Sequence, residues 1–311
     1  MQFVSIATIC GVIYSMVLNL CTFPLLAAMI WTNWRNERVL SPHFIVNLCT
    51  YLLGIVFCIP YTSYVAIGWR GDESHYSMLA MFWTGTFFYA HAAALSTSVL
   101  FLIWDRSFSL MFPITYTSKC RTLFCYANIT TQIVVYLFLI FWETQGMPSV
   151  TAYSNCMSYG CASETTAYKI TYMKVFFAVT NACSAAVFLA IFCRYNSTRP
   201  QQKGPQSRRN NTNANRLAAF TLCLELVFSV LPNGISYAVW LANEILLSPM
   251  LGPYLAYVFA TEVAVVTFVY VRVIGIQTRK GRVFNKTSSK SAIAVVGSKP
   301  TAVNSPTVLF F

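Results

Sequence analysis

Seven long apolar stretches, separated by almost all of the charged residues, constrain the fold of this chain most strongly. A helix needs about 20 mostly apolar residues to cross a bilayer, and each stretch reaches that length. Lipid offers no hydrogen-bond partner to the backbone, and a barrel strand would alternate in polarity over about 10 residues, so every stretch is predicted to be a helix. The sequence therefore predicts an all-α membrane protein with a seven-transmembrane helix bundle. The predicted helices cover Gln2–Trp31, Phe44–Gly68, Tyr76–Trp104, Thr122–Trp142, Tyr168–Cys193, Leu217–Leu241 and Leu247–Val271.

The composition and the distribution of charge fit a membrane protein of one orientation. Hydrophobic residues make up 57% of the 311 residues and charged residues only 10%, too few to cover a water-soluble surface. Of the 21 Lys and Arg residues, only Arg70, Lys169 and Lys174 fall on the side of the amino terminus. Basic loops stay in the cytosol, so we expect a multi-pass plasma-membrane protein with an extracellular amino terminus. The net charge of +12 then indicates contact with membrane lipid and an acidic intracellular partner, and not with nucleic acid.

The carboxyl-terminal segment differs in composition from the apolar part of the chain. From about Thr287 onward it is rich in Ser, Thr, Lys and Val, a composition typical of disordered segments. The sequence therefore predicts a seven-transmembrane domain at residues 1–286 and a disordered cytoplasmic tail at residues 287–311.

A charged pair at the end of the third predicted helix begins a longer motif. Asp105-Arg106 is followed by Pro113 and Tyr116, with the spacing of the pattern DRYxxxxxPxxY. An adjacent acid and arginine at a helix end can equally be a simple interfacial anchor. With the attached proline and tyrosine, however, the pattern resembles the signature of rhodopsin-like G-protein-coupled receptors. The resemblance implies that these four residues, together with Tyr270 in the seventh helix, couple to a heterotrimeric G protein.

Other positions both support this resemblance and depart from it. Asn19 and Pro232 fall where the family carries an asparagine in helix 1 and a bend in helix 6, and Arg272–Phe284 looks like its short amphipathic eighth helix. The family's helix 2 aspartate, however, falls on Leu52, and its outer helix 3 cysteine falls on Met81. These departures make the chain most similar to the divergent nematode serpentine chemoreceptors, which implies a chemosensory role and placement in a sensory cilium.

Three ionisable residues, His91, Glu225 and Glu262, lie well inside predicted helices. A charged side chain at the centre of a membrane helix costs about 2.5–3.5 kcal/mol on insertion scales, so each is a candidate functional residue. We hypothesise that Glu262 replaces the carboxylate missing at Leu52 and forms a polar switch with Asn19 and His91. The alternative is a protonated glutamate that makes one hydrogen bond between helices.

Aromatic residues crowd the predicted outer halves of the helices, where rings also commonly anchor a protein in the membrane interface. Phe88, Tyr89, Asn233 and Tyr237 match inward-facing pocket positions of the family and are the predicted ligand-binding residues. Few charges accompany these rings, so the pocket suits a small, weakly polar organic ligand. The seventh helix contains no lysine, so retinal cannot attach there and no cofactor is predicted.

Two cysteines are candidates for an extracellular disulfide. Only Cys156 and Cys161 fall in a predicted extracellular loop, where they either form a local disulfide or stay free. No metal site and no catalysis are expected. The sequence favours a G-protein-coupled chemoreceptor for a small molecule. A transporter, a ligand-gated channel and a non-signalling receptor partner are the alternatives.

Overall fold

Seven membrane-length helices dominate the computed structural model, as predicted. They are apolar enough to cross a bilayer, with mean hydropathies of 1.6 to 2.1 over their best windows, which confirms the seven-transmembrane bundle. The chain divides into two compact units, Met1–Phe268 and Val269–Phe311, and each is described by itself. The structure describes residues 2–35, 41–69, 75–148, 153–154, 158–162, 167–198, 215, 217–243 and 252–272.

The elements follow the predicted order along the chain, with the spanning helices joined mostly by short connections. The sixth span combines a helix at residues 217–225, a π-helical turn η2 (Leu226–Val230) and α8 (Leu231–Asn243). The seventh is the helix Tyr254–Arg272. The first five are α1 (Gln2–Arg35), α2 (Pro42–Gly68), α3 (Met78–Met111), α4 (Ser118–Thr144) and α6 (Ala167–Thr198).

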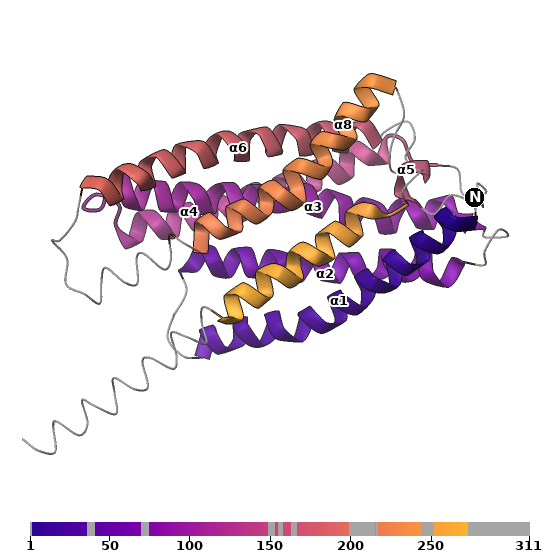
Figure 1. Ribbon diagram of the computed structural model, residues 1–311, viewed down its shortest axis with the longest axis horizontal. Coiled ribbons are helices and arrows are strands. Elements are labelled where there is room, and N and C mark those ends of the chain that lie inside the picture. Colours follow the sequence, from indigo (N-terminus) through magenta and orange to yellow (C-terminus); the bar gives the residue numbers. More distant parts are fainter. Residues whose placement is uncertain are drawn as a thin grey trace, which may run out of the picture. The chain divides into compact units, whose positions relative to one another are not determined.

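Helix α3 lies at the centre of the first unit and packs against α2, α4 and α6 (Figure 1). In its most apolar window 78% of the residues are buried, compared with 11% in α4. The outward side of α4 exposes large apolar side chains such as Leu123, Leu137 and Phe141. Such an apolar surface suits contact with lipid, so α4 is a peripheral helix, whereas α3 is central.

The third helix is longer than the sequence predicted. It continues from the predicted end at Trp104 to Met111, where the Phe112 N–H donates to the carbonyl of Phe108. A hydropathy criterion stops at the first charged residues, Asp105 and Arg106. In the structure both are buried and paired, so they lie within the helix and do not end it.

The sixth span is irregular directly before its proline. Residues 226–230 form a π-helical turn, and Pro232 lies in the first turn of α8. Proline lacks a backbone N–H and its ring clashes with the carbonyl four residues earlier, so a widened turn before it relieves both conflicts. This irregular turn lies directly before Pro232, where the sequence predicts a bend.

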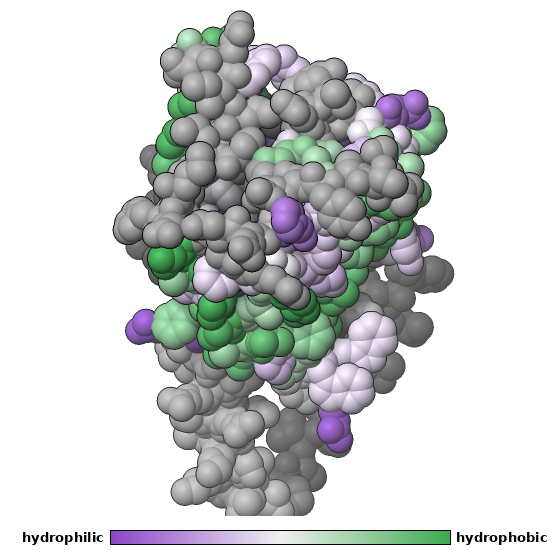
Figure 2. Space-filling view, turned by 90° about the vertical axis from the view of Figure 1, so that its right-hand side faces the viewer, coloured by the Kyte–Doolittle hydropathy of each residue, from purple (hydrophilic) through white to green (hydrophobic). Residues whose placement is uncertain are grey.

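The two ends of the first unit differ, and we name them after Asp105 and Tyr159. The Tyr159 end carries the amino terminus, a short helix α5 (Tyr159–Ala162) and two short strands (Figure 1). The all-α prediction did not anticipate β1 (Tyr76–Ser77) and β2 (Tyr153–Ser154), which pair antiparallel with Tyr76 opposite Ser154. Viewed onto this end, the coloured residues form broad hydrophobic areas with few strongly hydrophilic side chains (Figure 2).

Several predictions fall on parts of the chain that the structure does not describe. They are the eighth helix at Arg272–Phe284, of which only Arg272 is described, the tail at residues 287–311, and Cys156. These remain predictions.

Candidate functional site

The Asp105 end gathers residues from three helices around one carboxylate. After α3 ends, an exposed turn containing Pro113 reverses the chain, and the Thr117 hydroxyl accepts a hydrogen bond from the Cys120 N–H at the start of α4. This turn returns Tyr116 to Asp105, whose Oδ1 accepts a hydrogen bond from the Tyr116 hydroxyl at 2.8 Å. Burial and the neighbouring Asp105 carboxylate raise the pKa of Tyr116 above its usual range, so its hydroxyl stays protonated and donates.

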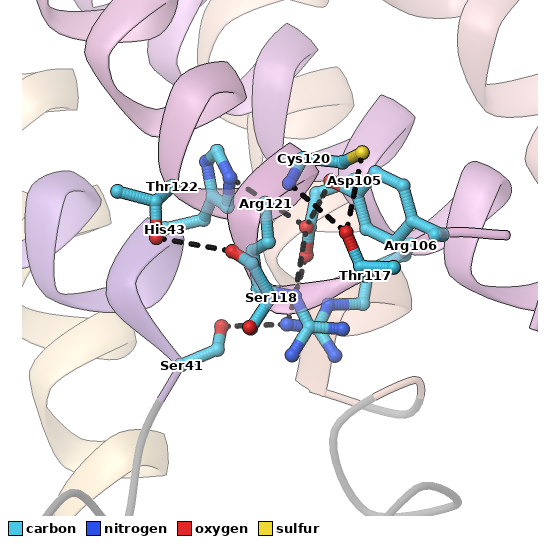
Figure 3. A network of polar contacts seen from close by, with 10 residues as sticks. Ser41, His43, Asp105, Arg106, Thr117, Ser118, Cys120, Arg121 and Thr122 are labelled. Atoms are coloured by element: carbon cyan, nitrogen blue, oxygen red, sulfur yellow. Dashed lines mark hydrogen bonds and ion pairs between the residues drawn. The ribbon is translucent and has the colours of Figure 1, made fainter.

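The Asp105 carboxylate is fully buried and lies among basic groups (Figure 3). Arg106 is 2.9 Å away at Oδ2, and Arg121 approaches Oδ1 at 3.4 Å. The His43 Nε2 from α2 lies 3.5 Å from the same Oδ1. Because a buried charge is tolerated only when it is paired, this cluster holds α2, α3 and α4 together through one acid.

Arg106 points inward in this conformation. Its guanidinium donates to the Ser41 hydroxyl at 2.5 Å, directly before α2, and lies 5.2 Å from the centre of the Phe44 ring. Only 5% of the residue is exposed. In the described conformation the Arg106 side chain is therefore held by contacts within the chain.

Of the predicted coupling residues, the structure thus brings Asp105, Arg106 and Tyr116 together. Pro113 lies in the exposed turn and makes that reversal. Tyr270 belongs to the other compact unit, near the end of the helix Tyr254–Arg272, and is not placed relative to the cluster.

A small cavity of about 40 Å³ lies among α3, α6 and the last two spans of the first unit. Its apolar lining includes Leu95, Phe228 and Phe259. Six polar side chains also line it, which is an unusual density for a membrane interior. They are Ser96, Lys174, Glu225, Ser229, Asn233 and Glu262.

Glu225 joins three helices at this cavity. Its Oε1 accepts a hydrogen bond from the Ser96 hydroxyl of α3 at 2.8 Å and another from the Asn181 amide of α6 at 3.4 Å. The same amide donates to the Ser96 carbonyl at 3.0 Å. A change in the position of the sixth span must therefore break or rearrange contacts with both α3 and α6.

Glu262 makes one hydrogen bond between helices, the contact that the alternative to the switch describes. It is 3% exposed, and it accepts a hydrogen bond of 2.7 Å from the Tyr51 hydroxyl on α2. Tyr51 directly precedes Leu52, the position on which the family's helix 2 aspartate falls. The seventh span is thus joined to α2 near the expected level.

The other two predicted switch residues have separate partners. Asn19 donates to the Ser15 hydroxyl and to the Cys58 sulfur, at 3.4 and 3.3 Å. The His91 Nε2 is 2.9 Å from the carbonyl of Thr50. Within the described ranges no hydrogen bond joins Asn19, His91 and Glu262 directly, so any coupling among them passes through α2.

The four predicted ligand-binding residues divide between the cavity wall and its surroundings. Asn233 lines the cavity. Phe88 packs edge-on against the cavity residue Phe259 at 5.4 Å, and Tyr89 lies beneath the cavity residue Lys174. Tyr237 is half-buried and contacts other aromatic rings of α6 and α8, and it does not line the cavity.

Lys174 is the main residue that sequence reasoning missed. Charge sorting assigned it to the outer side, whereas the structure places it in α6 with 6% of its surface exposed and its side chain lining the cavity. The available signal was its position: Lys174 lies within the predicted span Tyr168–Cys193, where a charged residue needs explanation.

A second missed group lies around Tyr159 in α5. The Tyr159 hydroxyl donates to the buried Glu143 at 2.8 Å and accepts from Thr86 at 3.1 Å, while its backbone N–H donates to the Tyr61 hydroxyl. Its ring stacks on Tyr89 at 4.8 Å. These contacts fix α5 into the Tyr159 end of the bundle.

Glycine and cysteine residues fit this arrangement. A Cβ at Gly85 would overlap the Tyr159 ring, so the glycine permits the close approach. Cys161, two residues after Tyr159, is disulfide-bonded. Its predicted partner Cys156 lies outside the described residues.

The comparisons with known proteins agree with the seven-helix fold. The chain matches the family model described as serpentine type 7TM GPCR chemoreceptor Srbc over residues 1–278, which include all seven spanning helices and both polar sites. Comparison with curated proteins gave no match. The protein is therefore a multi-pass membrane chemoreceptor by family, and the chain belongs to the serpentine-type seven-transmembrane chemoreceptors of the Srbc family.

Proposed function

We propose that this protein is a chemoreceptor that transmits binding of a small organic ligand to a heterotrimeric G protein. The ligand binds in the cavity beside Asn233, Glu225 and Glu262, with Phe88, Tyr89 and Tyr237 shaping its surroundings. Binding favours a state in which the sixth span moves outward about the π-helical turn and Pro232. The buried Asp105–Arg106–Tyr116 cluster is the observation that carries this proposal, because it holds the arginine closed in the described conformation.

We further propose that the Asp105 end faces the cytosol and that the amino terminus is extracellular. The basic residues Arg35, Lys119 and Arg194 lie at the ends of spans on this side, as the positive-inside rule requires. The receptor acts in the plasma membrane, including that of a sensory cilium. At the opposite end we assign Cys156 as the disulfide partner of Cys161.

Replacing Arg106 by Ala is expected to reduce ligand-evoked signalling at least tenfold, because the G protein loses the arginine that it contacts in the open state. Cells that carry the receptor and a cyclic-nucleotide or calcium reporter are screened with a panel of small organic compounds. The compound that gives the largest response is then used to compare the response of the variant with that of the unmodified receptor. Arg35→Ala, at an exposed arginine of α1 on the same side, is the matched control and should respond as the unmodified receptor does. Equal responses from Arg106→Ala and the unmodified receptor, at equal surface amounts, would count against the coupling role.

Glu262→Gln tests the proposed polar switch. The amide oxygen can still accept the hydrogen bond from Tyr51, so the fold should persist, but the group can no longer change its charge. We expect the ligand-evoked response to change at least threefold while the surface amount stays the same. Tyr51→Phe, which removes the donor and keeps the carboxyl group, should shift the response in the same experiment. Unchanged expression and signalling in both variants would rule the switch out.

A further inference from the structure

Lys174 is a buried amine that has no acidic partner in the described parts of the chain. No carboxylate oxygen there lies within 4.0 Å of its Nζ, and no hydrogen bond to the side chain is formed by those residues. Within the described ranges its Nζ lies over the face of the Tyr89 ring, 4.6 Å from the ring centre. An ammonium group has three donors, and burying it without an acceptor is unfavourable. The amine therefore has unused capacity to bind an acceptor.

The cavity beside Lys174 is the place where such an acceptor can bind. Lys174 lines this cavity directly, and only 6% of the residue is exposed to solvent. The other charged groups of the lining already have protein donors: Glu225 has Ser96 and Asn181, and Glu262 has Tyr51. Among the charged groups of the described lining, Lys174 is thus the one whose side chain has no hydrogen-bond partner, so an acceptor bound in the cavity pairs with it.

We propose that the ligand of this receptor is a small organic acid whose carboxylate pairs with the Lys174 ammonium. The inference rests on the proposed function, which makes this cavity the ligand site. The body of the acid lies against Leu95, Phe228 and Phe259, which supply the apolar wall. In the described conformation the cavity has a volume of about 40 Å³, well below the roughly 300–1,000 Å³ of ligand pockets, so binding of the acid requires the outward movement of the sixth span proposed above.

The test measures binding to the purified receptor without a G protein. The melting temperature of the full chain in detergent is followed with sodium salts of straight-chain acids of increasing length and with benzoate, each beside its primary amide, methyl ester and amine. At least one acid is expected to raise the melting temperature, and its amide and ester should not do so at the same concentration. Lys174→Met should weaken binding of that acid at least tenfold, and Lys174→Arg should restore most of it because the charge returns.

Two controls separate this proposal from folding and from coupling. Lys119→Met removes an exposed lysine of α4 at the Asp105 end and should leave the affinity unchanged. The melting temperature of Lys174→Met without ligand reports directly whether that variant is folded. Because no G protein is present, a failure of Arg106-dependent signalling would overturn the coupling proposal and leave this result intact. Stabilisation by amines but by no acid, no stabilisation by any acid, or equal affinity of Lys174→Met and the unmodified receptor would overturn the inference.

Discussion

Asp105→Ala is expected to lower the free energy of unfolding by about 3–5 kcal/mol, the usual cost of removing one partner from a buried ion pair. Asp105 is fully buried, and its carboxylate is the acid that Arg106 and Arg121 share with His43. The substitution leaves a buried guanidinium without its acid while α2, α3 and α4 lose their common contact. Unfolding of the purified receptor in mixed micelles with increasing SDS measures the change.

Two further variants identify the origin of that loss. Tyr116→Phe removes one donor to Asp105 and keeps both charges, so it should cost about 1.5–3 kcal/mol, the range of a hydrogen bond to a charged group. The double variant Asp105→Ala with Arg106→Ala should be more stable than the sum of the two single changes predicts, because the unpaired charge is then absent. If Asp105→Ala cost no more than Tyr116→Phe, the ion pair would not be what stabilises this end.

Tyr159→Ala is expected to cost about 3–5 kcal/mol, the range for truncating a buried aromatic side chain to alanine. The ring is 3% exposed and packs against Tyr89 and Phe82, with centroid distances of 4.8 and 6.2 Å. The variant also removes the donor to Glu143, which is fully buried. Thermal unfolding in detergent, followed by near-ultraviolet circular dichroism, measures both the stability and the order of the aromatic cluster.

A conservative variant divides this effect into its parts. Tyr159→Phe keeps the ring and its stacking and loses only the hydroxyl contacts with Glu143 and Thr86, so about 1.5–3 kcal/mol should be lost. Gly85→Ala should displace the ring by a different route, because its Cβ needs the space that the ring occupies. If Tyr159→Ala were as stable as the unmodified receptor, the segment around α5 would not be fixed by this side chain.

The spanning helices were predictable because membrane burial is a local property of the sequence. Each stretch of about 20 apolar residues must satisfy its own backbone in lipid, so its helical state follows without knowledge of its neighbours. The end of α3 was not predictable from the local sequence. Asp105 and Arg106 lie within the helix because the carboxylate is paired with basic groups, two of which come from other helices. The spacing from Asp105 to Tyr116 was informative because the two residues are close in the sequence. The last residues of α3 and a short turn join them, and their side chains form a hydrogen bond across 11 positions.

By itself the sequence determined the seven spans, the unequal distribution of basic residues and the motif that begins at Asp105. The tertiary structure alone decided which buried polar groups meet. Glu262 pairs with Tyr51 across 211 positions and Tyr159 meets Thr86 across 73. Lys174 lines the same cavity as Glu225 and Glu262 and forms no ion pair with a described residue. Hydropathy describes the preference of each residue for lipid, whereas these contacts depend on the rotation and packing of whole helices, which no local pattern specifies.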